Sequence, residues 1–320
     1  MNEILRKIGL YGIVPVVKID DVEKAVPLAK ALCDGGLPVA EITFRTKCAA
    51  EAIKRITTEF PQMLVGAGTV LTPDQADEAV AAGARFIVSP GLNPKVVAHC
   101  QKIGVPITPG CSNPSDIEAA LELGLDVVKF FPAEAAGGLP MIKAMSAPYG
   151  NLKFMPTGGL NESNILDYLK FNKILACGGS YMVSSDLINS GNFAKIEELT
   201  RAAVMQMHGF ELRHVGINFD SKDEALKTLN LLTKMFGYSQ TLNEGGAFAG
   251  ADIELMYTHF KGTLGHIAIG VNFLDRAIFY FQNMGIEFDP DFLAKFERGE
   301  TKAVYFKDEI GGFAFHIVQK

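Results

Sequence analysis

Eight short apolar runs recur along the first part of the chain, roughly every 20 to 25 residues. The segments between them have the apolar spacing of helices, as at 22–31 and 49–56. Nearly continuous apolar strands that alternate with helices are typical of a parallel sheet covered on both faces. The spacing therefore predicts eight βα units in a (β/α)8 TIM barrel, an α/β fold. The expected strands are Ile13–Val17, Val39–Phe44, Met63–Val70, Phe86–Ser89, Val105–Thr108, Val127–Phe131, Leu152–Pro156 and Ile174–Cys177.

An open doubly wound sheet is the alternative for these units. That fold is typically built from fewer strands and carries one early glycine-rich turn. The sequence contains no GxGxxG motif, which favours the barrel.

The composition changes near residue 207 and divides the chain into two expected domains. Of the 22 Phe, 8 precede this point and 14 follow it, and of the six His only His99 precedes it. We expect the barrel at residues 1–207 and an α+β domain of two βαβββ modules at residues 211–320. The join at 207–211 is too short and too apolar to be a flexible linker.

Charge and cysteine content exclude several classes of protein. The chain has 30 Lys and Arg against 36 Asp and Glu, a net charge of −6, which argues against binding to nucleic acid or membranes through bulk charge. No apolar run approaches the roughly 20 residues that a membrane span requires. The 5 cysteines never form a CxxC pair, so we expect reduced thiols in a cytoplasmic protein.

Two charged residues stand inside apolar strands of the expected barrel. They are Glu41 in the second run and Lys129 in the sixth. An unpaired buried charge is costly, so a structural ion pair between them is one interpretation. The other is chemical: an ammonium group among Val and Phe side chains loses hydration, which favours the neutral amine that attacks a carbonyl group. We therefore expect a lysine that forms an imine with a keto substrate, and a carboxylate that carries protons.

Two glycine pairs fall at the ends of the seventh and eighth runs, and we expect each pair to form a turn. Gly158-Gly159 follows Thr157, and Gly178-Gly179 precedes Ser180. In this fold the loops after strands 7 and 8 commonly bind phosphate through backbone N–H groups, so we expect a phosphate site there. Arg45, four residues after Glu41, offers a planar guanidinium suited to a carboxylate.

Residues from about 10 to 205 resemble the 2-keto-3-deoxy-6-phosphogluconate (KDPG) and 4-hydroxy-2-oxoglutarate (KHG) aldolases, which are class I pyruvate-dependent lyases. The stretches that carry this resemblance are VPVVKI, AEITFRT, VGAGTVL, SPGL, VKFFPAE, PTGG and GGSYMV, in order along the chain. Tyr181 departs from the family, because many relatives have tryptophan at that position. The sequence CSNP from Cys111 to Pro114 also replaces a loop that often has Thr before Pro.

The resemblance implies Lys129 as the Schiff-base residue and Glu41 as proton acceptor and donor. It also implies that Arg45, Thr69 and Pro90 surround the pyruvate moiety, that Thr157 borders the electrophilic partner, and that Gly158, Gly159, Gly178, Gly179 and Ser180 lie near the phosphate. No cofactor is implied for this reaction. The substrate would be a phosphorylated 2-keto-3-deoxy sugar acid, and the assembly a homotrimer or another homo-oligomer.

An internal repeat marks the last 110 or so residues: RHVGINF from Arg213 is echoed by GHIAIGV from Gly265. Side chains alternate between the two faces of a strand, so Val215 and Ile217 are expected to pack on helices. The opposite face would carry His214, Glu254, His266 and His316. Three imidazoles and a carboxylate suit Zn²⁺, Ni²⁺, Mn²⁺ or Fe²⁺.

This second domain resembles the vicinal oxygen chelate superfamily, which includes glyoxalase I. The resemblance implies that His214, Glu254, His266 and His316 are metal ligands, although His316 stands where glutamate is more common. A packing or assembly domain with no metal is the alternative. For the whole chain, two further readings stay open: a barrel that only senses phosphosugars, and a metal-dependent isomerase or lyase in the second domain.

Overall fold

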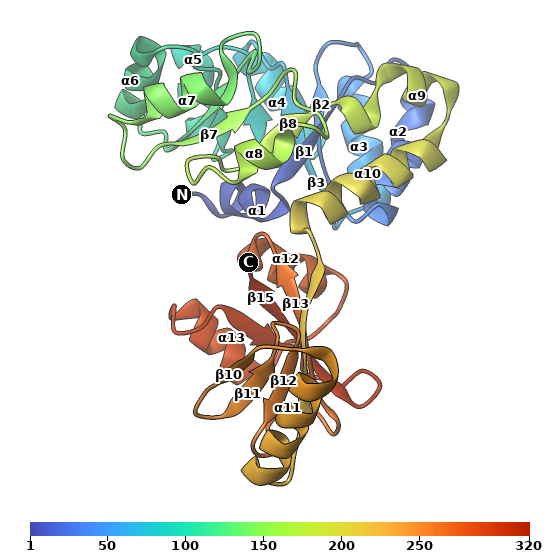
Figure 1. The fold of residues 1–320 in the computed structure, drawn as a ribbon. Helices are drawn as coiled ribbons and strands as arrows, with labels where there is room; N and C mark the ends of the chain where they lie inside the picture. Colours follow the sequence, from blue (N-terminus) through green and yellow to red (C-terminus); the bar gives the residue numbers. More distant parts are fainter. The chain divides into compact units, whose positions relative to one another are not determined.

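The structure is a computed structural model that describes residues 1–320. Its chain separates into two units, Met1–Met207 and His208–Lys320, which Figure 1 shows in blue to yellow and in yellow to red. None of the helices combines the length and the apolar character that crossing a bilayer requires.

A parallel sheet forms the centre of the first unit. Six strands are hydrogen-bonded in the order β5-β4-β3-β2-β1-β8, and β6 pairs with β7. Isolated parallel bridges continue the pairing, with Gly110 opposite Lys129 and Thr157 opposite Gly178. Strands that follow one another in the chain are therefore neighbours, and β8 returns to β1, as in TIM-like α/β folds. The strands are β1 (Ile13–Val17), β2 (Val39–Thr43), β3 (Leu64–Gly68), β4 (Ile87–Val88), β5 (Ile107–Thr108), β6 (Val127–Phe130), β7 (Lys153–Pro156) and β8 (Cys177–Gly179).

Helices follow the strands, and local sequence fixes where several of them begin. Three successive helices start with a capping side chain followed by proline, at Thr72, Asn93 and Asn113. The helices are α1 (Glu3–Tyr11), α2 (Ala25–Asp34), α3 (Ala49–Glu59), α4 (Pro73–Ala81), α5 (Pro94–Lys102), α6 (Pro114–Glu122), α7 (Gly138–Ser146), α8 (Ile165–Leu169), α9 (Ser185–Ser190) and α10 (Phe193–His208), with short 3₁₀ helices η1 (Val22–Lys24) and η2 (Tyr181–Val183).

The second unit contains a seven-stranded sheet in the order β10-β11-β12-β9-β13-β15-β14. The first strand of each repeat lies at the centre, because β9 pairs antiparallel with β13. Each also pairs in parallel with the last strand of its own repeat, β9 with β12 and β13 with β15. The elements are β9 (Glu211–Asn218), α11 (Lys222–Phe236), β10 (Gln240–Leu242), β11 (Gly246–Ala249), β12 (Ile253–Met256), β13 (Gly265–Val271), α12 (Leu274–Asn283), α13 (Pro290–Glu297), β14 (Ala303–Tyr305) and β15 (Phe313–Gln319).

Two hydrophobic clusters support this sheet. One joins Leu229 of α11 to Leu255 of β12, and the other joins Ile278 of α12 to Ile317 of β15. Ile217 belongs to neither cluster and is 38% exposed, so the expectation that it packs on a helix is wrong. It lies on the central strand β9, whereas α11 packs on β11 and β12 and α12 packs on β15.

Candidate active site and a second polar cluster

Lys129 and Glu41 form a buried ion pair inside the first unit. The Lys129 Nζ donates a hydrogen bond to the Glu41 Oε1 at 3.4 Å, and the two side chains are 7% and 2% exposed. Paired positions on parallel strands, and positions two apart on one strand, point to the same side. Glu41 pairs with Val16, and Val14, two residues earlier, pairs with Gly178. Gly178 pairs with Thr157, and Met155, two residues before Thr157, pairs with Lys129. Glu41 and Lys129 therefore point to the same side of the sheet.

Glycine on β3 makes room for this carboxylate. A Cβ atom at Gly68 would lie 2.0 Å from the Glu41 Oε1, a distance that no side chain tolerates. At Gly66 a Cβ atom would lie 2.3 Å from the Phe86 ring. The stretch VGAGT therefore contains its glycines because the interior beside β3 is filled by Glu41 and Phe86.

Arg45 and Thr69 meet just beyond the ends of β2 and β3. The Arg45 Nε donates to the Thr69 Oγ1 at 3.4 Å. Thr69 has φ +58°, a left-handed conformation that is costly for a β-branched residue. The Pro90 carbonyl packs against Gly110, because a Cβ atom at Gly110 would lie 2.0 Å from the Pro90 carbonyl oxygen. Gly110 is in turn the bridge partner of Lys129. The structure thus brings Pro90 to the backbone beside Lys129.

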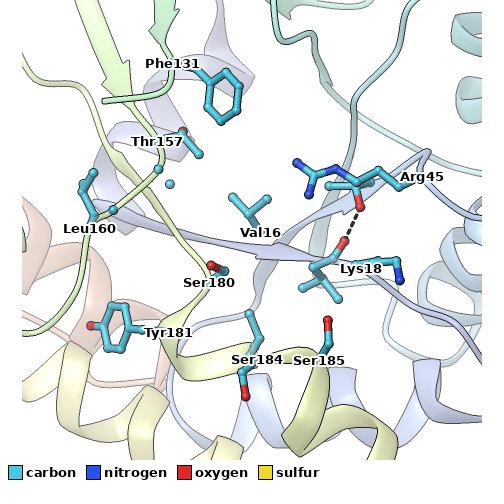
Figure 2. Close-up of a pocket in the computed structure, with 16 residues that line it drawn as sticks. Val16, Lys18, Arg45, Phe131, Thr157, Leu160, Ser180, Tyr181, Ser184 and Ser185 are labelled. Carbon is cyan, nitrogen blue, oxygen red and sulfur yellow. Dashed lines mark hydrogen bonds between the residues drawn. The ribbon is translucent and has the colours of Figure 1, made fainter. Parts of the chain in front are cut away.

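A cavity of about 510 Å³ opens at the carboxyl ends of the strands. Of the residues expected in the site, Arg45, Thr157, Gly158, Gly159, Gly178 and Ser180 line it, and Figure 2 shows Arg45 across the cavity from Thr157. Thr69, Pro90 and Gly179 lie outside the lining, as do Glu41 and Lys129, which stay buried. Phe131, two residues after Lys129, does line it, and the Lys129 Nζ lies 5.4 Å from the centre of its ring.

The two glycine pairs differ in conformation, which corrects the expectation of two similar turns. Gly158 and Gly159 have φ +101° and +82° and form a true turn after β7. Gly178 and Gly179 instead lie within β8. Glycine is required at 178 because a Cβ atom there would lie 2.3 Å from the Thr157 Oγ1, so close packing explains it and a turn does not.

A partly buried hydrogen bond lies beside the Gly158-Gly159 turn. The Tyr168 hydroxyl donates to the Glu134 Oε1, and a Cβ atom at Gly159 would lie 2.6 Å from the Glu134 Cβ. Burial, followed by the hydrogen bond to Glu134, raises the pKa of the Tyr168 phenol, which therefore stays protonated as a donor. Glu134 holds the turn from the outside.

Several lining residues were not anticipated, most notably Lys18, Ser184 and Ser185. Tyr181, which the sequence marked as a departure from the family, lines the cavity as well. Lys18 is the first residue after β1, and a position directly after a strand is the signal that would have identified it. Burial, with a smaller effect of Glu162, raises the pKa of Tyr181 to about 12. Its hydroxyl is buried without a hydrogen-bond partner.

A second polar cluster lies in the second unit. The His266 Nε2 lies 3.0 Å from the Glu254 Oε2, and the His214 Nε2 lies 3.4 Å from the same oxygen. The two Nε2 atoms are 3.2 Å apart. The His316 ring lies 5.3 Å from the His266 ring, measured between centres. The register places the four residues on one face: Gly216 pairs with both Glu254 and His266, and Ala268 with both His214 and His316.

These histidines have the features that a cation site needs. Burial lowers the pKa of His316 to about 3, with smaller effects from His266 and His214, so its ring is neutral at neutral pH. Burial also lowers the pKa of His214, although Glu254 opposes the shift. The Nδ1 atoms of His266 and His316 are buried without a hydrogen-bond partner. Neutral imidazoles beside one carboxylate fit a divalent transition metal.

Comparison with known proteins identifies relatives of the first unit. The family model "KDPG and KHG aldolase" matches residues 2–199. The 2-dehydro-3-deoxy-phosphogluconate aldolase of Haemophilus influenzae is 50% identical over 203 residues, which are 63% of this chain and 96% of that protein. The same enzyme of Treponema pallidum is 52% identical over 201 residues, again 63% and 96%.

Solved structures agree with these matches. The KDPG aldolase of Legionella pneumophila, with pyruvate captured as a covalent carbinolamine intermediate, is 41% identical and has a TM-score of 0.60, covering 62% of this chain and 97% of its own. The aldolase of Zymomonas mobilis with 3-phosphoglycerate is 42% identical, with a TM-score of 0.60 and coverage of 64% and 96%.

Proposed function

Because the chain belongs to the KDPG and KHG aldolase family and is a class I aldolase, a carbon–carbon lyase, we propose that Lys129 is its Schiff-base residue. The observation that carries this proposal is the buried pair of Lys129 and Glu41, 3.4 Å apart, beside a cavity of about 510 Å³. We propose further that the eight strands of the first unit form a closed (β/α)8 barrel around this pair.

The pair can move every proton that imine formation requires. Glu41 takes a proton from the Lys129 ammonium, and the free amine adds to the 2-keto carbon of the substrate. The carbinolamine hydroxyl leaves as water with the proton that Glu41 returns, and a cationic imine remains. Burial favours this exchange, because two charges are replaced by two neutral groups in an interior that solvates charge poorly.

Glu41 then acts a second time in the cleavage step. It takes the C4 hydroxyl proton, directly or through a water, while the C3–C4 bond breaks and its electron pair moves into the iminium. C4 leaves as an aldehyde, and the enamine takes a proton at C3. Water hydrolyses the imine to release pyruvate and the Lys129 amine. This route requires no metal or other cofactor.

We assign the substrate's two ends to different parts of the cavity. Arg45, held by Thr69, binds the carboxylate of the pyruvate moiety beside Pro90, and Thr157 borders the aldehyde half. The Gly158-Gly159 turn and Gly178, Gly179 and Ser180 bind the phosphate. The proposed reactions are cleavage of KDPG to pyruvate and glyceraldehyde 3-phosphate, and of KHG to pyruvate and glyoxylate. The pyruvate of the Legionella structure and the 3-phosphoglycerate of the Zymomonas structure support this division.

Pyruvate release from each substrate tests the proposal. We expect the native chain to cleave at least one of the two substrates and the Lys129→Met variant to cleave neither. The circular dichroism spectrum of the variant should match that of the native chain. Lys143→Met, which removes an exposed lysine on α7, is the matched control and should keep full activity. A native chain that binds the substrates without releasing pyruvate would instead favour a phosphosugar-sensing barrel.

We propose a homotrimer as the assembly, as expected from the family. One chain has a mass of 34.6 kDa. Light scattering of the purified protein should give the mass of three chains, and the mass of a single chain would refute it.

We propose, as a second function, that the second unit binds a divalent transition metal and is a vicinal-oxygen-chelate-like domain of two βαβββ modules. The convergence of the His214, Glu254 and His266 ligand atoms within 3.4 Å favours it. His316 lies beside them as the fourth candidate. When bound, the metal would supply Lewis-acid chemistry.

Elemental analysis of protein purified without chelator tests the metal proposal. We expect stoichiometric metal in the native chain and none in the variant His214→Ala/His266→Ala. His259→Ala is the matched control, because His259 is exposed and pairs with Asp220. Metal retained unchanged in the double variant would eliminate this site.

A further inference from the structure

The charges that line the cavity of the first unit are all positive. Lys18 and Arg45 are its two charged residues, and no carboxylate is among the lining side chains. In Figure 2 both lie on the same side of the cavity, away from Thr157, Leu160 and Tyr181. The substrates proposed above carry two anionic groups, and Arg45 accounts for one of them. Lys18 has no role in that assignment.

Strand pairing places Lys18 between the two anion-binding ends of the cavity. Lys18 follows β1, which pairs with β2 on one side and β8 on the other. Arg45 comes two residues after β2, and Ser180 comes directly after β8. The carboxyl ends of parallel strands meet on one rim, so the order along the rim is Arg45, Lys18, Ser180. Lys18 is therefore nearer than the glycine turn to the carboxylate end of a substrate held by Arg45.

The ammonium group of Lys18 has a partner that a substrate can replace. Its Nζ lies 2.7 Å from the Asp20 Oδ1, and the two side chains are 42% and 39% exposed. The hydrogen bond from Lys18 lowers the pKa of the Asp20 carboxyl. Solvent-exposed pairs of this kind contribute little to stability, so exchange of Asp20 for a substrate anion is inexpensive.

We infer that Lys18 binds the distal carboxylate of the shorter substrate class, five-carbon 2-keto dicarboxylic acids such as KHG. This inference rests on the proposed aldolase function. In the phosphorylated six-carbon acid the distal anion extends past C6 and reaches the Gly158-Gly159 turn. In the five-carbon acid the distal carboxylate is C5 itself, which ends short of that turn and within reach of the flexible lysine that follows β1. The cavity thus has two distal anion sites, and Lys18 determines whether the short substrate is accepted.

Steady-state kinetics on both substrates tests this role. Lys18→Met keeps the length of the side chain and removes its charge, and loss of a charged hydrogen bond corresponds to about a 10- to 100-fold change. We expect kcat/KM for KHG to fall by that factor, mainly through KM, while kcat/KM for KDPG changes less than about threefold. Lys18→Arg should restore most of the KHG activity. Asp20→Asn should lower KM for KHG, because it releases the ammonium group.

Borohydride trapping with pyruvate separates failure of this inference from failure of the aldolase proposal. Pyruvate lacks the distal carboxylate, so Lys18→Met should be trapped as fully as the native chain. If the native chain is not trapped, the proposed function is wrong. If trapping is intact but Lys18→Met affects both substrates equally, affects only KDPG or changes neither, the role assigned to Lys18 is wrong.

Discussion

Removal of either member of the Lys129–Glu41 pair should destabilise the first unit far more than removal of both. The side chains are 7% and 2% exposed, so each single variant leaves a charge in the interior without its partner. Loss of one partner of a buried pair costs about 3–5 kcal/mol. Lys129→Met and Glu41→Gln should each have this cost at neutral pH, which sums to about 6–10 kcal/mol if the effects are independent.

The double variant leaves no charge in the interior. Its main cost is the buried Gln amide without a partner, about 1–3 kcal/mol. The double-mutant cycle should therefore give a coupling free energy of about 6 kcal/mol, above the 0.5–3 kcal/mol range of ordinary neighbours. Such a value would identify a buried ion pair with no other strong partner for either charge.

Urea unfolding measured by pulsed hydrogen exchange is the suitable assay. The chain contains no Trp, and peptides from residues 1–207 report on the first unit without a contribution from the second. If the double variant loses the sum of the two single losses, the side chains do not form the pair described here.

Three further predictions concern stability. Thr108→Val should raise the free energy of unfolding of the first unit by about 1 kcal/mol, because the Thr108 hydroxyl is buried without a hydrogen-bond partner. A lower urea midpoint than that of the native chain would contradict this. Burial, with a smaller effect of Arg276, lowers the pKa of His208 to about 4, so below about pH 6.5 the unfolded chain binds a proton that the folded chain does not. The second unit should therefore lose about 1.4 kcal/mol for each pH unit between 6.5 and 4, and unfolding curves of His208→Phe should lack this part of the pH dependence. Zn²⁺ at 100 times its dissociation constant should stabilise the second unit by about 2.7 kcal/mol, and Glu254→Gln should abolish that shift in calorimetry.

The sequence predicted most of the strands, and the burial of Glu41 and Lys129, because both depend on local patterns. The last strand was expected at Ile174–Cys177 and lies instead at Cys177–Gly179. Each apolar run is long enough to identify a strand, and a charge inside such a run stands out. The glycines at 178 and 179 were misread as a turn, because a glycine pair is common in turns. Glycine at 178 is instead required by the side chain of Thr157, which directly follows the neighbouring strand β7 and which sequence alone does not place.

Lys18 was not singled out, although its position directly after a barrel strand marks it as a candidate. Its position depends on the pairing of β1 with β8, a contact between residues more than 160 positions apart in the chain. In the second unit, alternation correctly placed four polar residues on one face of the sheet. It did not reveal that α11 and α12 leave Ile217 on β9 uncovered.

The most direct test of covalent catalysis by Lys129 is peptide mapping after reduction. The native chain is incubated with pyruvate and borohydride, digested and analysed by mass spectrometry, with Lys18 as the internal comparison because it lines the same cavity. We expect the mass of a reduced pyruvate imine on the peptide that contains Lys129 and on no other. An adduct on Lys18, or no adduct on folded protein, would contradict the assignment of Lys129 as the Schiff-base residue.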